Sequence, residues 1–366
     1  MIFLFVHIAK TAGSSVNRFF QERLGESACL VHQESNPAWS RPPLPDEFLD
    51  GVQYISGHMP YRVFTARLLG QPLHTLTVLR DPRHHVVSHL AWIRHLKDAG
   101  QENRLAAHPD FIQVLAEKIA LHDLSDPASL SHLVAGLNKE EYRLLDNPQV
   151  LYLTHRNRPG EGLDERDVEY AIDTLREVDT FGFVDELGGF FAELSEVVGE
   201  ASEVREVPHE NALVDRYGLS TTNEAQMQAL MPLIMHDMSL YERAKHLKQE
   251  RREGAALPTY RRRDARGHLS QPNPRGHAGG WAFDMQRAGS VQLDVYLNDK
   301  HVAVVEAARA RKDLREKFER DCAFVIDLNK LKARSGDRLA VFFQGTNIEL
   351  NGSPRELPAE VESTSS

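Results

Sequence analysis

The sequence predicts an α/β fold in which a parallel sheet is flanked by helices and a small antiparallel β domain follows. Three observations predict it. Short apolar runs of strand length alternate with helical patterns through the first 250 residues. A stretch rich in Arg, and then in Gly, Pro, Ser and Asn, comes next. Beyond residue 280 the apolar period is two, which is typical of strands with one buried face and is carried by Val291, Leu293, Val295 and Leu297.

The first element is a strand over Met1–Ile8, which is nearly all apolar and is bounded at once by small and polar residues. A helix follows, and its apolar stripe comprises Val16, Phe19, Phe20 and Leu24. We expect Ser14 and Ser15 to cap the N-terminus of this helix. A strand, a small-residue loop with a lysine, and a helix together indicate a phosphate-binding loop. The parallel sheet is therefore expected to be of P-loop type.

The loop itself reads Lys10-Thr11-Ala12-Gly13-Ser14-Ser15. Gly13 lets the backbone approach an anion closely, the N–H groups at the helix start point toward that anion, and the helix dipole favours negative charge. Lys10 adds a point charge at the same oxygens. Because Lys10 precedes Gly13 by three residues, the loop is not a Walker A sequence, in which the lysine follows the last glycine.

A second strand, Leu76–Leu79, ends at Arg80-Asp81-Pro82, and Pro82 suits the first turn of the helix that continues to Leu96. An arginine at the carboxyl end of a strand can bind a phosphate through two N–H groups. The hydroxyl of Ser88, two turns into the helix, can donate to the same phosphate.

The two motifs resemble those of sulfotransferases that use 3′-phosphoadenosine 5′-phosphosulfate (PAPS), in the carbohydrate and uronyl 2-O-sulfotransferase-like branch, over about residues 1–247. The resemblance implies that residues 10–15 hold the 5′-phosphosulfate, that Arg80 and Ser88 hold the 3′-phosphate, and that PAP is the product. The sequence departs from the family pattern at Ala9, which replaces a proline, and at His85, which replaces an arginine and weakens the expected grip on the phosphate. Further segments resemble the family in the right order, namely 146–153, 181–186, 208–211 and 237–242.

The acceptor hydroxyl needs a base. A strand over Val52–Ile55 ends just before Ser56-Gly57-His58, and the ends of such strands are where ligands bind. A histidine that titrates near neutrality can take the proton of a hydroxyl. The resembled family has an active-site histidine in a matching segment, which implies His58 as the catalytic base. Glu34 is the alternative base, because related sulfotransferases place a glutamate after the second strand. Lys10 is expected to meet the charge of the leaving group.

Four histidines on the helix that begins near Pro82 suggest a metal site at first, because His85 and His89 lie one turn apart; the other two are His84 and His95. A transition-metal site needs three or four converging ligands, and no Cys or carboxylate cluster accompanies these histidines at matching spacing. We therefore expect no metal, and the resembled family works without one.

The chain is expected to divide into a PAPS-binding sulfotransferase domain (1–250), a basic and Gly/Pro-rich linker (251–280), an accessory β domain (281–358) and a disordered tail (359–366). The linker contains six arginines between residues 251 and 266; we interpret it as solvated, with binding of an acidic polymer as the alternative. Within the β domain, a turn at Asn298-Asp299 joins two strands, and residues 322–328 and 338–343 form others, which predicts a sandwich.

Composition excludes several classes. The 366 residues, 41% of them hydrophobic, can bury a sizeable core, and no stretch reaches the ~18 apolar residues of a membrane span. Met1–Ile8 is too short for a signal peptide. Cys29 and Cys322 lie far apart, so no disulfide framework is implied and a reducing, cytoplasmic setting fits. The net charge of −10 argues against a nucleic-acid partner.

The resemblance carried by the two motifs implies an enzyme that moves a sulfuryl group from PAPS to a hydroxyl, and we expect a carbohydrate or glycan as the acceptor. Two alternatives stay open. A nucleotide-dependent kinase would also use a phosphate loop, although a Walker A lysine is lacking. A non-catalytic glycan-binding protein on a sulfotransferase scaffold is the other, and the histidine at position 85 and the extra β domain keep it open. Two features stay open at this point: the identity of the acceptor, and whether the chain forms a homo-oligomer.

Overall fold

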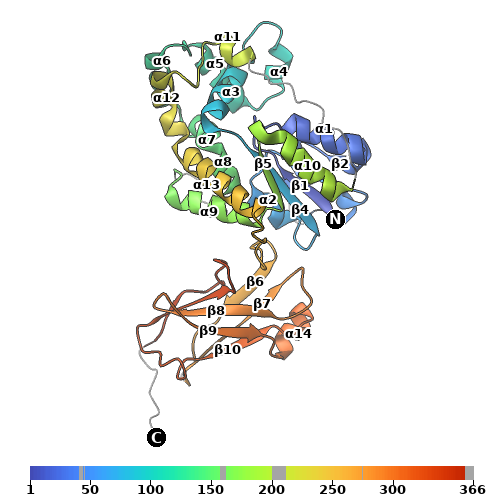
Figure 1. Cartoon of the computed structure of the whole chain (residues 1–366), viewed down its shortest axis with the longest axis vertical. Helices are drawn as coiled ribbons and strands as arrows, with labels where there is room; N and C mark the ends of the chain where they lie inside the picture. The colour runs from blue at the N-terminus through green and yellow to red at the C-terminus, as the bar shows by residue number, and fades with distance from the viewer. Residues whose placement is uncertain (41–43, 45, 157–161, 200–211, 274, 359–366) are drawn as a thin grey trace. The chain divides into compact units, whose positions relative to one another are not determined.

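The structure is a computed structural model that describes residues 1–40, 44, 46–156, 162–199, 212–273 and 275–358 (Figure 1). The chain divides into two compact units, Met1–Ala256 and Leu257–Ser366, close to the boundary predicted at residue 250. The predicted tail and the family-like segment 208–211 lie outside the described residues.

The prediction of a linker over 251–280 is wrong for most of that range. Its first residues end helix α13 (Met235–Arg252), and strands β6 (Ala265–Leu269) and β7 (His277–Asp284) belong to the second unit. Glycines in these strands hide the alternating apolar pattern that would identify them in the sequence. Close packing between neighbouring strands explains why glycine is present. A Cβ on Gly280 would lie 2.0 Å from the carbonyl oxygen of His268 on the neighbouring strand.

The first unit is built on a five-stranded sheet in the order β2-β3-β1-β4-β5, and every neighbouring pair is parallel. The strands are β1 (Ile2–Val6), β2 (Cys29–Leu30), β3 (Tyr54–Gly57), β4 (Leu73–Leu79) and β5 (Thr180–Phe183). The prediction of a parallel sheet flanked by helices is confirmed. Since all strands are parallel, their carboxyl ends meet at one edge of the sheet.

Helices cover both faces of this sheet, which explains why β1 is apolar throughout. Phe3 and Phe5 face the cluster shared with α1 (Gly13–Leu24) and α10 (Leu187–Val198). Leu4 and Val6 face the opposite cluster, which includes side chains of four helices: α2 (Tyr61–Arg67), α8 (Pro148–Leu153), α9 (Glu165–Glu177) and α13. A strand buried on both faces must be apolar at successive positions rather than at every second one.

A second group of helices forms its own core beside the sheet. It contains α3 (Pro82–His95), α4 (Glu102–Ala106), α5 (Asp110–Ala120), α6 (Pro127–Ala135), α7 (Lys139–Leu145), α11 (Ala212–Arg216) and α12 (Glu224–Leu230). Helix α3 begins as predicted, because Pro82 occupies its first turn and the Asp81 carboxylate accepts hydrogen bonds from the N–H groups of Arg83 and His84. Among the described residues, no helix combines the length and the apolar character needed to cross a bilayer.

The second unit contains two antiparallel sheets that share one hydrophobic core. One sheet has the order β10-β7-β6 and the other the order β12-β11-β8-β9. The remaining bounds are β8 (Val291–Leu297), β9 (Lys300–Ala307), β10 (Ala323–Asp327), β11 (Arg338–Phe343) and β12 (Arg355–Glu356). The turn predicted at Asn298-Asp299 joins β8 to β9, and both residues have positive φ. Helix α14 (Lys312–Phe318), which the sequence analysis did not predict, packs on β7 through Trp281, Phe283 and Phe318.

Candidate functional site

The candidate residues lie at the carboxyl edge of the parallel sheet. After β1 the chain runs toward β2 on one side, whereas β4 lies on the other side of β1, so the segments that leave β1 and β4 diverge. Ligands of open α/β sheets bind in the crevice at such a point. Lys10 follows β1 and Arg80 follows β4; His58 follows β3, next to β1 in the sheet.

The loop after β1 has a distinctive backbone. Lys10 and Ala12 both have left-handed φ values, 66° and 64°. Thr11 between them is fully buried, and its hydroxyl donates to the carbonyl of Ile8 at 2.8 Å, which closes the loop on itself. Gly13 packs directly against the imidazole of His7, since a Cβ on Gly13 would lie 1.6 Å from Nε2 of that ring. Glycine is therefore required at this position.

The prediction that Ser14 and Ser15 cap helix α1 is wrong. The helix begins at Gly13 with Ala12 as its N-cap residue, and no side chain caps it. The two left-handed residues turn the chain before either serine can reach a capping position, so both serines lie inside the first turn. A helix N-terminus without a side-chain cap leaves its backbone donors and its dipole for an anion in the loop.

The two predicted phosphate motifs meet in the structure. Nη1 of Arg80 donates to the carbonyl of Lys10 at 3.0 Å, across 70 residues of chain. One of the five N–H donors of the guanidinium is used in this bond. Burial lowers the pKa of Arg80, and Asp81 beside it opposes that shift. The ammonium of Lys10 lies 6.0 Å from the ring centroid of Trp92 on α3, so an indole flanks the cation.

Gln149 fixes the backbone of Arg80. Its side-chain amide donates to the carbonyl of Arg80 and accepts from the N–H of Arg80, both at 2.9 Å, and the side chain is almost completely buried. Gln149 is held in turn by Asp237, whose carboxylate accepts from the N–H groups of Gln149 (3.2 Å) and Val150 (2.8 Å). Burial raises the pKa of Asp237 to about 7. Asn147 accepts from the N–H groups of His236 and Asp237.

These contacts give a positioning role to the segments 146–153 and 237–242, for which the sequence suggested family likeness alone. The signal that could have identified Gln149 was its place in the first of these segments. Its partner Arg80 lies 69 residues away, however, and no local pattern joins the two.

His85 supports the loop and does not stand in for a phosphate-binding arginine. Its Nε2 lies 2.7 Å from the carbonyl oxygen of Ala9 and, since a carbonyl only accepts, donates to it. Burial lowers the pKa of His85 to about 4, so the ring is neutral at physiological pH and carries no charge to a phosphate. Ser88, on the same buried face of α3, is 7% exposed. Its role as a phosphate ligand stays a prediction.

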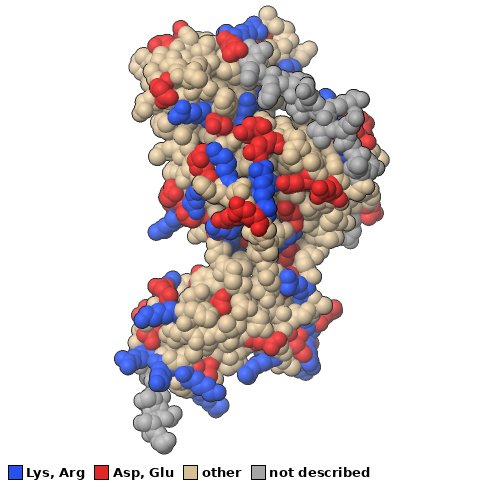
Figure 2. All heavy atoms as spheres, viewed as in Figure 1, with Lys and Arg blue, Asp and Glu red and all other residues tan. Residues whose placement is uncertain are grey.

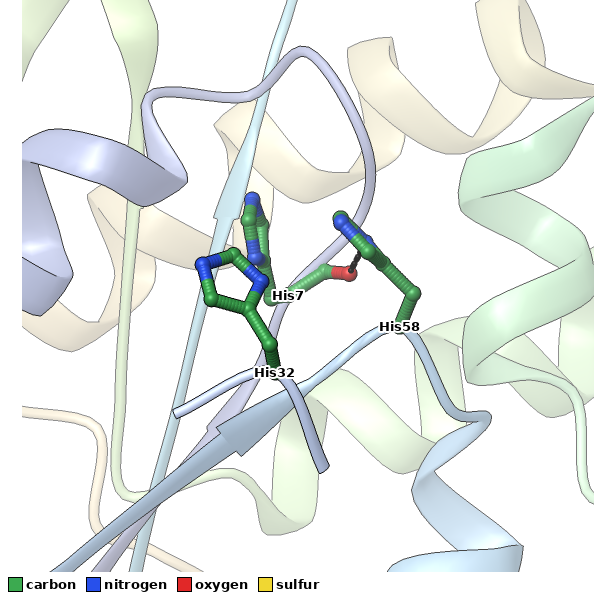
Figure 3. Close-up of side chains that lie close together, drawn as sticks. All are labelled: His7, His32 and His58. Carbon is green, nitrogen blue, oxygen red and sulfur yellow. Dashed lines mark hydrogen bonds between the residues drawn. The ribbon is translucent and has the colours of Figure 1, made fainter. Parts of the chain in front are cut away.

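The histidines of α3 do not converge. His84 is exposed, His85 and His89 are buried and stack with ring centroids 6.1 Å apart, and His95 pairs with Asp98 at 2.8 Å. In the part of the chain that the structure describes, the histidines that do come together are three others: His7, His32 and His58 (Figure 3). Only His58 among them was predicted from the sequence as a site residue.

His58 is held in one orientation. Its Nδ1 lies 2.8 Å from the carbonyl oxygen of His7 and donates to it, so Nε2 carries the lone pair. The N–H of His58 donates to Oε2 of Glu34 at 2.9 Å. Burial lowers the pKa of His58 more than Glu34 raises it, which favours the neutral ring. The two candidate bases thus lie side by side, and Glu34 positions the backbone of His58.

A polar groove of about 630 Å³ opens beside the loop. Its lining includes hydrogen-bonding side chains from α1, from the 3₁₀ turn before β2 and from the segment after β2, namely Ser14, Asn17, Arg18, Gln21, Glu22, Glu26 and His32. The buried Asn17 at its floor accepts from the hydroxyls of Tyr54 and Ser56. A groove lined by donors and acceptors of both charges suits a ligand rich in hydroxyl groups.

No protein-family model matches the chain, and no curated protein matches it either. The motifs and the geometry that joins them are therefore the features that bear on function.

Proposed function

We propose that this chain is a sulfotransferase that moves a sulfuryl group from PAPS to an acceptor hydroxyl. The observation that carries the proposal is the contact between the two motifs: Nη1 of Arg80 lies 3.0 Å from the carbonyl oxygen of Lys10, at the carboxyl ends of adjacent parallel strands. PAPS carries its 5′-phosphosulfate and its 3′-phosphate on the same ribose, so it needs two neighbouring anion sites. The loop and Arg80 supply the cations for both.

The donor-binding roles follow from the positions of the residues. The loop Lys10–Ser15, with the uncapped start of α1, takes the 5′-phosphosulfate through backbone N–H groups and the ammonium of Lys10. Arg80, with its backbone fixed by Gln149, takes the 3′-phosphate, and Ser88 is the second ligand that the family resemblance implies.

The transfer step needs one base and one group that stabilises the negative charge of the leaving group. Nε2 of His58 takes the proton of the acceptor hydroxyl while the hydroxyl oxygen attacks sulfur. The bond between sulfur and the bridging phosphate oxygen breaks, and PAP leaves with the electron pair. Lys10 and the N–H groups of the loop meet the negative charge that grows on that oxygen. Glu34 remains the alternative base.

The acceptor that the site favours is a carbohydrate hydroxyl, because the groove beside the loop is polar and open. The same proposal includes three further points. The five-stranded sheet is of P-loop type, and the second unit is a β-sandwich. The setting is cytoplasmic, which suits the two free, buried cysteines. Across the face of the first unit that Figure 2 shows, basic and acidic side chains are interspersed.

Incubation with sulfur-labelled PAPS and a panel of oligosaccharide, lipid and phenolic hydroxyl compounds tests the proposal. Transfer of label to a saccharide, abolished in Lys10→Ala, is the expected result. Binding of ATP in preference to PAP would favour a kinase. Tight PAP binding without transfer to any acceptor of the panel would favour the non-catalytic alternative.

A further inference from the structure

Three histidines from three strand ends converge beneath the donor loop. His7 follows β1, His32 follows β2 and His58 follows β3, and the order β2-β3-β1 makes these strands neighbours. One side-chain nitrogen from each lies within 4.8 Å of the other two (Figure 3). In that view the rings of His32 and His58 approach the ring of His7 from different sides.

A second observation that points to a ligand concerns the ring of His7. The side chain is 6% exposed, and its Nδ1 is buried without a hydrogen-bond partner. A buried nitrogen left without a partner is unfavourable, so such an atom points to a missing ligand or proton acceptor. The Nε2 edge of the same ring is covered by Gly13. Nδ1 is therefore the atom of His7 that remains for a ligand.

The neighbours of the cluster resemble the surroundings of metal-binding histidines. Nδ1 of His58 donates to a backbone carbonyl, which fixes the tautomer and leaves Nε2 as the ligand atom. Oε1 of Glu34 lies 3.6 Å from Nδ1 of His32, so a carboxylate stands just outside the three rings. Burial and the neighbouring imidazoles also lower the pKa values of His7 and His58, which favours the neutral rings that ligate metals.

The three histidine nitrogens need to move only slightly closer together to bind one ion. A tetrahedral ion with Zn–N bonds of ~2.0–2.1 Å holds its nitrogens about 3.4 Å apart. His32 is the exposed one of the three rings and directly precedes the short 3₁₀ turn Gln33–Ser35.

We propose that His7, His32 and His58 form a three-histidine site for a borderline divalent metal such as Zn²⁺, with the fourth position left to water. The expected effect of this metal on activity rests on the proposed function. A metal on Nε2 of His58 occupies the lone pair that would accept the acceptor proton, so metal binding and sulfuryl transfer exclude one another. The site would make the enzyme sensitive to inhibition by free zinc.

Metal binding is tested on the full chain, freed of metal with a chelator, by titration with Co²⁺ and by calorimetry with Zn²⁺. We expect the intense visible bands of tetrahedral cobalt and a 1:1 zinc isotherm. His32→Asn should weaken zinc binding at least about 100-fold, because a ligand is lost. Asparagine suits the left-handed backbone of residue 32 (φ 56°) and keeps the fold. His132→Asn, at an exposed histidine of α6, is the matched control.

Two readouts separate this proposal from the proposed function. Absence of cobalt bands, or equal zinc affinity in His32→Asn and His132→Asn, would overturn the metal site whatever the enzyme does. Zinc should slow transfer by the parent relative to the metal-free rate of the parent, and it should not slow transfer by His32→Asn relative to that variant's own metal-free rate. Zinc that binds through His32 without slowing transfer would overturn the exclusion between metal and base, and with it the role of His58 as base, while the metal site would remain.

Discussion

Gln149→Leu tests whether the buried amide positions Arg80. The substitution keeps the volume but removes two 2.9 Å hydrogen bonds to the backbone of Arg80. Each bond contributes about 1 kcal/mol net, and the N–H and C=O left behind cost more where they stay buried, so we expect a loss of about 2–4 kcal/mol in the free energy of unfolding. Arg80 then loses its set position, and with it at least one charge-assisted bond to the 3′-phosphate. PAP should bind about 10–100 times more weakly.

Gln226→Leu is the matched control for this prediction. Gln226 is as deeply buried, and in the helical part of the same unit its amide donates to the carbonyls of Ser125 and Gly218, both at 2.9 Å, and accepts from the N–H of Ser220 at 2.8 Å. Urea denaturation should show a loss of stability in Gln226→Leu at least as large as that in Gln149→Leu, whereas calorimetry should show weaker PAP binding only in Gln149→Leu. If the two variants lose PAP affinity equally, or if neither does, Gln149 does not position a donor-binding group.

Three further predictions concern the loop and the base. Lys10→Ala should lower turnover of labelled PAPS more than it lowers PAP affinity, because the charge that Lys10 meets grows during transfer; equal losses would contradict that role. His58→Ala should lower turnover about 10²–10⁴-fold with PAP affinity unchanged, and an active His58→Ala beside an inactive Glu34→Gln would transfer the role of base to Glu34. Gly13→Ala should abolish PAP binding, since its Cβ would lie 1.6 Å from the ring of His7, and adding His7→Ala should restore part of it; no restoration would argue against that clash as the cause.

The elements that the sequence predicted well are those with local signals. β1 and β4 are apolar runs of strand length, and α3 starts where an Asp-Pro pair provides both a cap and a fixed φ. The start of α1 was misplaced because two serines are typical of a cap, whereas the left-handed backbone of Lys10 and Ala12 depends on the closure of the loop by Thr11. Strands β6 and β7 were missed because glycines interrupt their apolar pattern.

The candidate site was predicted in part for the same reason. Lys10, Arg80 and His58 each follow a strand, and parallel strands bring such positions to one edge. Which of these positions meet depends on the order of the strands, which one sequence does not specify. The order β2-β3-β1 brings His32 and His58 to His7, and a contact between residues 69 apart brings Gln149 to Arg80.

The central claim is that the loop and Arg80 bind the 5′-phosphate and the 3′-phosphate of one nucleotide, and the direct test compares PAP with adenosine 5′-phosphate by calorimetry. The two ligands differ only by the 3′-phosphate. We expect PAP to bind at least about 10-fold more tightly, and this difference to disappear in Arg80→Ala, since charge-assisted bonds contribute ~1.5–3 kcal/mol each. Equal affinity of the parent protein for the two nucleotides, or a difference that survives in Arg80→Ala, would contradict the account.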